Sequence, residues 1–325
     1  MKSPLPQWRK QAFPLNWQQE FGGVERLHLE VGFGDGRYTV RRAKEEPESG
    51  FVGLELSSTS LKRAWRKLRR EEIENVRILK TKAQFAVQHL FAPQSLSSII
   101  VNFPDPWPKE RHTKNRLLQT SFFRLAASRL KAEGAIYLAT DHPEYLAFAR
   151  EEALNSGLFT LQDAEPPEAV FETKYALKWK GQGKPLFYQV FAYNAKPAPD
   201  FPSLETPSTM PHALLAGDLP DSVTFDKLVV PYGDGHVIVH ELARSLGSED
   251  EDDKEKWLFR VSVDEPDLMQ QMLVVVKRRT GDELIVRLES FGDPIITKTV
   301  RGAIHAVTEW LLEQGEELKV KERNY

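Results

Sequence analysis

The sequence predicts an α/β fold, in which a doubly wound and mostly parallel sheet is followed by a smaller C-terminal α+β domain. Three observations carry this prediction. From about Arg26 to Asn194, short apolar β-type runs alternate with amphipathic stretches of helical period, as expected of parallel βαβ units. A glycine-rich turn directly follows the first apolar run. Beyond a proline-rich stretch, several strand-like runs precede one amphipathic helix.

The alternation defines the elements of the first domain. Apolar runs predict strands at Leu27–Val31, Phe51–Leu56, Val76–Leu79, Ser98–Phe103 and Ala135–Thr140. Helical periodicity predicts helices near Tyr38–Glu46, Leu61–Glu72, Phe85–Phe91, Leu117–Leu130 and Pro143–Asn155. Two later runs, Val170–Ala176 and Leu186–Tyr193, are expected to close the sheet as an antiparallel pair. Ligands should bind at the C-terminal ends of the parallel strands.

The second half of the chain begins with a linker. Prolines recur through Ala195–Pro211, where they remove backbone donors and fix φ, so we place a linker at 196–215 between domains at 1–195 and 216–325. The acidic run Ser248–Glu255 is expected to be a solvated loop. The C-terminal domain should contain strands at Ser222–Pro231, His236–His240, Lys256–Val263, Leu273–Lys277 and Glu283–Ser290, and a helix at Lys298–Glu313. No motif in it indicates a role.

Composition limits the chemistry. The chain has 325 residues, a formal net charge of -3 and no cysteine. Disulfides, thiolate metal sites and a cysteine nucleophile are therefore excluded, and we expect no metal site. An RNA-binding surface would have to be a local patch, because the chain as a whole is not basic. The N-terminus lacks the apolar core of a signal peptide, and no apolar run is long enough to span a membrane, so we expect a cytoplasmic protein without a membrane segment.

The glycine-rich turn indicates the class of cofactor. Glu30-Val31-Gly32-Phe33-Gly34-Asp35-Gly36 ends the first strand and opens a helix, so Gly32 and Gly34 let the backbone approach a ligand. Its spacing is G-x-G-x-G, whereas the dinucleotide fingerprint is G-x-G-x-x-G. Glu30 would repel a pyrophosphate and suits the cationic sulfonium and ammonium groups of S-adenosylmethionine. The turn therefore favours this methyl donor over a dinucleotide.

A second carboxylate supports an adenosine-type cofactor. Glu55 ends the second strand, where it can accept hydrogen bonds from both ribose hydroxyls. Dinucleotide-linked oxidoreductases place a carboxylate there as well, so Glu55 does not decide between the two cofactors, and such an oxidoreductase remains a distant alternative.

A proline-rich motif follows the fourth strand. Prolines at 104, 106 and 108 stiffen the loop around Asp105 and Trp107 at the expected ligand edge. The Asp105 carboxylate can accept hydrogen bonds from the Watson–Crick edge of guanine, and the Trp107 ring can stack on a base. The alternative is that the prolines and Trp107 have a purely structural role in this loop. The basic residues that follow can supply donors to phosphate and sugar: Lys109, Arg111, His112, Lys114 and Arg116.

The full string Phe103-Pro104-Asp105-Pro106-Trp107-Pro108-Lys109, continuing through Arg116, resembles the bacterial tRNA (guanine-N7)-methyltransferase family. The glycine-rich turn, Phe51–Glu55 and Ala139-Thr140-Asp141 occur in the family's order, and the resemblance spans roughly Leu27 to Tyr193. It implies a Rossmann-like class I methyltransferase fold, S-adenosylmethionine as cofactor and tRNA as partner, with the methyl group transferred to guanine N7, in the variable loop. It also implies that Glu30 and Glu55 bind the cofactor, that Asp105 is catalytic or orients guanine, and that Lys109 and Asp141 contact RNA.

Two positions depart from the family's pattern. Thr81-Lys82-Ala83 stands where the family has a G-D-A type sequence, so backbone atoms of Lys82 and Ala83 are expected to replace the usual adenine contact. Thr173-Lys174-Tyr175 is followed by Ala176 where the family has glutamate, and Thr173 alone is carried over as a substrate contact. Two alternatives stay open: a methyltransferase that acts on another substrate, such as another RNA guanine or a protein, and, since two family positions are altered, a tRNA-binding protein that has lost catalysis. The oligomeric state is not indicated.

Overall fold

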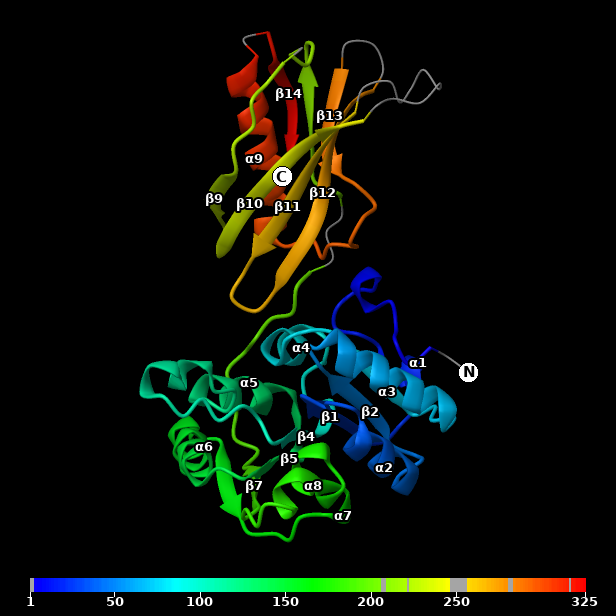
Figure 1. Cartoon of the computed structure of the whole chain (residues 1–325), viewed down its shortest axis with the longest axis vertical. Helices are drawn as coiled ribbons and strands as arrows, with labels where there is room; N and C mark the ends of the chain where they lie inside the picture. The colour runs from blue at the N-terminus through cyan, green and yellow to red at the C-terminus, as the bar shows by residue number, and fades with distance from the viewer. Residues whose placement is uncertain (1–2, 206–208, 221, 246–255, 280–282, 316) are drawn as a thin grey trace. The chain divides into compact units, whose positions relative to one another are not determined.

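The computed structural model describes residues 3–205, 209–220, 222–245, 256–279, 283–315 and 317–325. Its described residues form two compact units, each with its own sheet (Figure 1). The first unit extends to Leu204, except for Arg9–Ala12, and the second contains Arg9–Ala12 and the described residues from Glu205 onwards. The acidic run Ser248–Glu255 lies outside the described residues. No helix in the described ranges is both long and apolar enough to cross a membrane.

The sheet of the first unit has the order β3-β2-β1-β4-β5-β7-β6. Strands β1 to β5 pair with their neighbours in parallel, and β7 is antiparallel to both β5 and β6. This is the predicted doubly wound fold with antiparallel final strands. Its strands are β1 (Leu27–Val31), β2 (Gly50–Leu54), β3 (Val76–Leu79), β4 (Leu96–Asn102), β5 (Leu130–Thr140), β6 (Phe159–Gln162) and β7 (Phe187–Tyr193).

Helices cover both faces of this sheet (Figure 1). Helices α2 and α3 bury their apolar residues in one common cluster, and α2 also contacts α7. Helix α5 contacts both α4 and α6, in a separate layer. The helices are α1 (Trp17–Phe21), α2 (Arg37–Glu45), α3 (Ser58–Arg70), α4 (Ala83–His89), α5 (Thr120–Arg129), α6 (Pro143–Ser156), α7 (Glu168–Phe171) and α8 (Lys174–Lys180).

One predicted strand is wrong. Val170–Ala176 does not pair in the sheet but forms the end of α7 and the start of α8, and the partner of β7 is β6 at Phe159–Gln162. Val170 is buried against the sheet, and the Thr173 hydroxyl accepts a hydrogen bond from the Ala176 amide, which starts a new helical turn. Strand β6 gives a weak sequence signal because only Phe159 of its residues is buried.

The proline-rich segment makes hydrogen bonds with side chains of the first unit at Phe201, Pro202 and Leu204. Arg129 donates to the Phe201 carbonyl, Gln88 Nε2 donates to the Pro202 carbonyl at 3.1 Å, and the Leu204 amide donates to His89 Nδ1 at 3.2 Å. Strand β8 (His212–Ala216) begins inside the expected linker at 196–215. Prolines exclude regular hydrogen bonding within the segment, but its carbonyls remain acceptors for side chains of the first unit.

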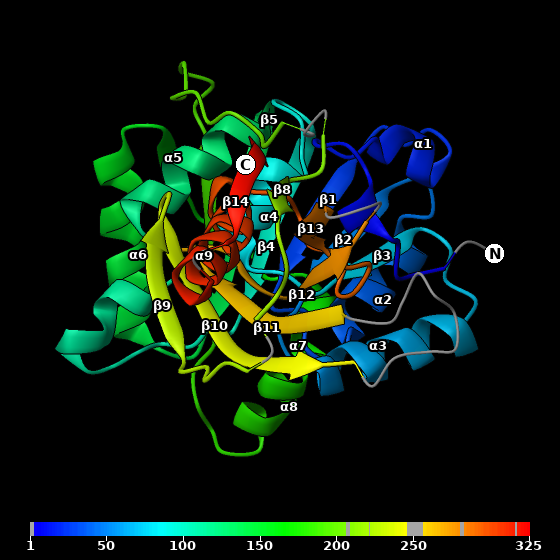
Figure 2. The same ribbon diagram turned by 90° about the horizontal axis from the view of Figure 1, so that it is seen from above.

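The second unit is an antiparallel sheet with one long helix. The strand order is β14-β8-β13-β12-β11-β10-β9, and α9 (Lys298–Gln314) packs along one face (Figure 2). Alternate residues of its strands form a core with the apolar face of α9. The predicted α+β class is confirmed, but β8 and β14 were not predicted. The other strands are β9 (Leu228–Tyr232), β10 (Gly235–Arg244), β11 (Lys256–Asp264), β12 (Met269–Arg278), β13 (Glu283–Leu288) and β14 (Lys319–Asn324).

Candidate functional site

A cavity of about 640 Å³ opens at the C-terminal ends of β1, β2 and β4. It is the position at which open α/β sheets bind ligands. The cavity brings together these residues singled out in the sequence: Glu30, Gly32, Gly34, Glu55, Lys82, Ala83, Asp105 and Thr173. Lys109, Arg111, His112, Lys114, Arg116 and Asp141 are not among the residues that line it.

The glycine-rich turn shapes one wall of the cavity. Gly32 and Gly34 have φ of 72° and 59°, which is the left-handed region that favours glycine. A Cβ atom added at either residue would meet nothing within 4 Å. The backbone conformation, and not crowding by the protein, therefore requires glycine here, and the turn leaves room for a ligand to approach its backbone.

Glu55 is fixed by the backbone around it. One carboxylate oxygen accepts from the Gly34 amide at 3.1 Å, and the other accepts from the amides of Leu56 and Ser57 at 2.8 and 2.9 Å. Each carboxylate oxygen has two lone pairs, so the group retains capacity for further donors. Glu55 thereby ties the glycine-rich turn to the end of β2 and still presents an acceptor edge to the cavity.

Glu30 is a buried carboxyl on the same wall. Thr39 donates to its Oε2, and Asn102 Nδ2 donates to its Oε1 at 3.1 Å. Burial raises the pKa of Glu30 to about 7, although both hydrogen bonds act in the opposite direction. A cation in the cavity would stabilise the ionised form, so the site is suited to a positively charged ligand.

Two further buried polar atoms face this cavity without a partner. The Thr81 hydroxyl oxygen and Asn102 Oδ1 make no hydrogen bond, and both residues line the cavity. Buried polar atoms are normally satisfied, so these two indicate an absent ligand that carries donors. The set of a buried carboxyl, an amide oxygen, a hydroxyl and an accepting Glu55 fits S-adenosylmethionine, with its ammonium, sulfonium and ribose hydroxyls. The sequence reasoning did not identify Thr81 or Asn102 as site residues.

The departure at the third strand affects the backbone of the cavity more than its charge. Lys82 is the N-cap residue of α4, and Ala83 is the first residue of that helix. Both line the cavity. Their amides stand at the beginning of the helix, where backbone donors have no partner within it. Lys82 and Ala83 thus place the start of α4 on the cavity wall, and their contact with the adenine stays a prediction.

The proline-rich loop extends from the end of β4 along the cavity. Phe103 and Trp107 have φ of 52° and 42°, an uncommon conformation for residues other than glycine. The Phe103 amide donates to the Ala139 carbonyl at 2.7 Å, which fixes the start of the loop. Asp105 lies between these two residues, exposed to solvent and on the cavity wall. The carboxylate is therefore presented by a constrained backbone and is accessible to a substrate.

Arg116 differs from the expectation. Its guanidinium is buried and donates to the Pro106 carbonyl at 2.9 Å and the Trp107 carbonyl at 3.3 Å. The same group lies 4.7 Å from the ring centroid of Phe148. These contacts leave it inside the loop and not on the surface, so the prediction that Arg116 offers its charge to phosphate is wrong. Arg116 instead holds the loop that carries Asp105.

The remaining basic residues of the motif lie on the surface. Lys109, Arg111 and Lys114 are exposed, on or beside a short 3-10 helix at Glu110–Asn115. His112 is half-buried, accepts from Arg111 Nε at 3.0 Å and packs edge-on against the ring of Trp107. The exposed cations form a local positive surface next to the Asp105 loop, as required of an RNA contact in an acidic chain.

Asp141 and Thr173 have local partners. Asp141 Oδ2 lies 3.6 Å from Lys184 Nζ, at the C-terminal end of β5. Thr173 is buried and donates its hydroxyl to the Val170 carbonyl at 2.8 Å, in addition to accepting from Ala176. Thr173 therefore orders α8 beside the cavity, and Asp141 stands at the same edge of the sheet. His142, which follows Asp141, caps α6 through Nδ1.

Comparison with known proteins shows the family. The family described as "Putative methyltransferase" matches residues 24–189, about half of the chain. A protein of Thermus thermophilus named tRNA (guanine-N(7)-)-methyltransferase is 40% identical over 311 residues, which cover 95% of this chain and 96% of the relative. The chain belongs to the tRNA (guanine-N(7)-)-methyltransferase family. A relative of the same name from Deinococcus radiodurans is 40% identical and covers 91% of this chain and 92% of the relative.

Members of this family differ in how much of the chain they share. A relative of the same name from Limosilactobacillus reuteri is 33% identical over 181 residues, which cover 84% of that protein but 54% of this chain. Most of that relative thus corresponds to about half of the present chain, whereas the Thermus and Deinococcus relatives extend over both units. A relative that matches only about half of this chain therefore carries the same name as the relatives that match both units.

Among the described residues, no group of His, Asp and Glu is arranged to hold a metal ion.

Proposed function

We propose that this protein transfers a methyl group from S-adenosylmethionine to N7 of a guanine in tRNA. One observation supports this most strongly: a single cavity joins the acidic, glycine-rich turn to the rigid Asp105 loop, in a chain whose relatives carry the corresponding name over nearly their whole length. A tRNA substrate also favours a cytoplasmic location. We assign the activity to the domain at 1–195, which contains every element of the cavity.

The cofactor supplies an electrophilic methyl group on a sulfonium. Guanine N7 has an in-plane lone pair and needs no deprotonation before it attacks, so positioning and exclusion of water should account for most of the rate. Glu55 binds the ribose hydroxyls, Glu30 and Asn102 bind the cationic part of the donor, and the backbone at Lys82 and Ala83 receives the adenine. Asp105 accepts hydrogen bonds from the guanine edge and orients N7.

The tRNA docks on the surface beside this cavity. Lys109, Arg111 and Lys114 bind phosphates, His112 and Asp141 contact the nucleotides near the target, and Thr173 supports α8 at the substrate side. We propose the variable loop as the site of the target guanine. Counterion release from the bound phosphates would make tRNA affinity fall with salt.

A direct experiment tests this function. Unmodified tRNA is incubated with protein and S-adenosylmethionine, digested, and its nucleosides are mapped by mass spectrometry. We expect 7-methylguanosine at one position in the variable loop. Methylation of another RNA guanine, or of another atom, would contradict the proposed substrate and favour a methyltransferase with a different target. Donor binding without any transfer would favour a tRNA-binding protein that has lost catalysis.

A further inference from the structure

The first unit contains a second cavity, of about 760 Å³, away from the catalytic edge. It lies over the N-terminal half of β1, β4 and β5, whereas the donor cavity lies at their C-terminal ends. Tyr38 of α2 is the residue common to the two linings, so its side chain stands between them. No residue of the proposed catalytic or RNA-binding set lines this second cavity.

The floor of the second cavity is made by side chains on one face of the sheet. His28 of β1 is opposite Ser98 of β4, and Ile100 of β4 is opposite Tyr137 of β5. The rings of Tyr137 and Tyr188 are stacked with centroids 6.4 Å apart. Alternate residues of parallel strands point to the same face, so this aromatic floor follows directly from the register.

Two buried nitrogen atoms in the wall have no hydrogen-bond partner. These are His28 Nε2 and Arg42 Nε. His28 Nδ1 is 2.7 Å from the Ser98 hydroxyl, and the nearest carboxylate oxygen to Nε2, on Glu46, is 3.5 Å away. Burial lowers the pKa of His28 to about 4, although Glu46 opposes this shift, so the ring is neutral at physiological pH. Arg42 Nε is a donor that lies 3.8 Å from Glu45 Oε2, so it has an ion-pair neighbour but no acceptor within hydrogen-bond distance.

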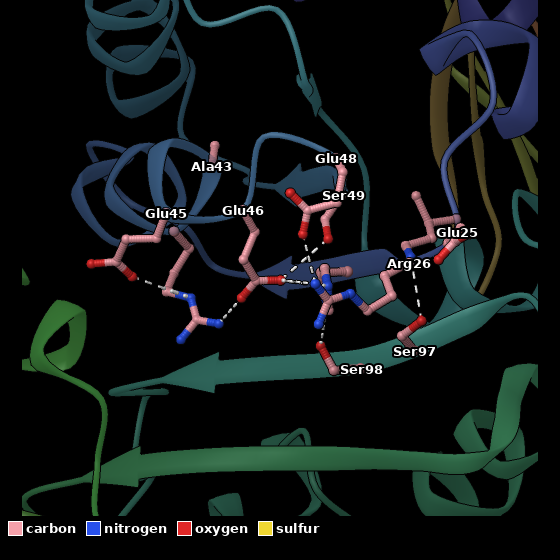
Figure 3. A network of polar contacts seen from close by, with 12 residues as sticks. Glu25, Arg26, Ala43, Glu45, Glu46, Glu48, Ser49, Ser97 and Ser98 are labelled. Carbon is pink, nitrogen blue, oxygen red and sulfur yellow. Dashed lines mark hydrogen bonds and ion pairs between the residues drawn. The ribbon is translucent and has the colours of Figure 1, made fainter.

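Charged side chains of both signs border the aromatic floor. Figure 3 shows Glu46 and Glu48 beside Arg26, with Ser98 on the strand below. Arg26 Nη2 is 2.7 Å from Glu48 and 3.6 Å from Glu46, and Arg42 also contacts Glu46. Lys131 Nζ donates to the main-chain carbonyl of Glu25 at 2.5 Å. Because this acceptor is neutral, the contact does not balance the positive charge of Lys131. Glu133 and Glu165 also line the cavity, so it offers carboxylate acceptors as well as cations.

We propose that this second cavity is a binding site for a purine nucleotide. The aromatic floor fits a flat base, His28 Nε2 makes a hydrogen bond to a ring atom, and Glu133 or Glu165 accepts an exocyclic amine. Lys131 and Arg26 at the rim bind the phosphate. The volume lies within the range of roughly 300–1,000 Å³ typical of small-molecule sites. The same chemistry is offered by a free mononucleotide and by a nucleotide within RNA.

Calorimetry on the full chain tests this site. The donor cavity is saturated with S-adenosylhomocysteine, and GMP, AMP and inorganic phosphate are titrated as separate probes, followed by a short oligonucleotide that contains the same base internally. We expect at least one mononucleotide to bind and phosphate alone to bind far more weakly. Binding of the oligonucleotide but of no mononucleotide would assign the site to RNA, with the same chemistry.

Variants localise the binding. Ala164→Trp fills the cavity from an exposed position in its wall and should abolish nucleotide binding, whereas Ala147→Trp on the exposed side of α6 should not. His28→Phe keeps a flat ring and should weaken binding by roughly 3- to 10-fold, as expected for loss of one hydrogen bond. Asp105→Ala separates this cavity from the substrate site and should leave nucleotide binding intact. If no probe binds, or if Ala164→Trp binds as the wild type does, the assignment is overturned.

Discussion

The guanidinium of Arg116 donates a hydrogen bond to the main-chain carbonyl of Trp107 at 3.3 Å. Trp107 itself has a positive φ of 42°, so the loop adopts a conformation that the chain does not favour on its own. The bond from Arg116, together with the one to Pro106, holds that conformation beside Asp105. Arg116 is therefore a positioning residue, and its role differs from that of the exposed cations in the same motif.

Arg116→Lys should lower kcat by about 10- to 100-fold, because lysine cannot make two directed bonds to neighbouring carbonyls and small displacements of a reacting group are costly. Donor affinity should not change, and the salt dependence of tRNA binding should be kept because Arg116 is buried and does not contact phosphate. Arg124→Lys, at an exposed position on α5, is the matched control and should be nearly silent. Equal effects of the two variants on kcat would contradict the positioning role.

Asp105→Asn should abolish methyl transfer while donor binding persists. The carboxylate is exposed on the cavity wall, and we assign its contacts to guanine, so loss of its negative charge removes acceptors for the guanine edge. Single-turnover rates and calorimetry with S-adenosylmethionine check the two halves of this expectation. A parallel loss of donor affinity would show that Asp105 contacts the cofactor instead.

Glu55→Gln should weaken donor affinity by about tenfold or more. Charge-assisted bonds to the ribose are each worth roughly 1.5–3 kcal/mol, and the amide replaces one acceptor by a donor. Part of the loss will come from the glycine-rich turn, because the Gly34 amide is bonded to this carboxylate. Glu151→Gln, exposed on α6, is the control for equilibrium dialysis with labelled donor. An unchanged affinity would exclude the ribose contact.

Donor affinity should rise as pH rises through about 7, where burial sets the pKa of Glu30. The protonated carboxyl present below this pH cannot attract the cationic donor, whereas the carboxylate above it can. Because the pKa of Glu30 is raised above the value of 4.5, the donor-free protein should also lose stability as pH rises from 4.5 towards 7. Calorimetry from roughly pH 6 to pH 8 checks the affinity, and Glu30→Gln should flatten the profile. A profile that Glu30→Gln leaves unaltered would assign the titration to another group.

Replacement of Lys109, Arg111 and Lys114 by alanine should weaken tRNA binding and flatten its salt dependence. Each phosphate contact that is lost lowers the slope of log affinity against log salt by roughly 0.7–0.9. Filter binding at several salt concentrations measures this slope, and donor affinity serves as the internal control. If the triple variant keeps the wild-type slope, RNA docks elsewhere, and the basic helix α3 becomes the better candidate.

Secondary structure could be predicted from the sequence where the residues of an element themselves determine its conformation. The parallel strands β2, β3 and β4 were recognisable because nearly all of their residues are buried and they contain apolar runs. Val170–Ala176 has a similar apolar composition, yet it is helical because a threonine cap and tertiary burial decide its conformation. Strands β8 and β14 depend on pairing with each other, which no short window of sequence reveals.

The same distinction applies to the site. Glu30, Glu55 and Asp105 follow strands or interrupt a stiff loop, so their position at the ligand edge could be predicted from topology. The sequence gives no reason to assign Thr81 or Asn102 a ligand contact, and only the unpaired Thr81 hydroxyl and Asn102 Oδ1 beside the cavity identify them. Arg116 was misread because a motif shows charge but not burial. The signal that could have separated it from Lys114 was its place just after the 3-10 turn, where it faces back towards the loop.

The position of β1 between β2 and β4 also governs how the nascent protein can fold. His28 pairs with Ser98, 70 residues further along the chain, so the central strand has an unpaired edge until β4 has left the ribosome. At usual synthesis rates that interval is about 4–14 s. During this time the glycine-rich turn and α2 can pack only on β1, β2 and β3. The early chain therefore exposes an apolar strand edge, which makes this interval the stage at which chaperone binding would matter most.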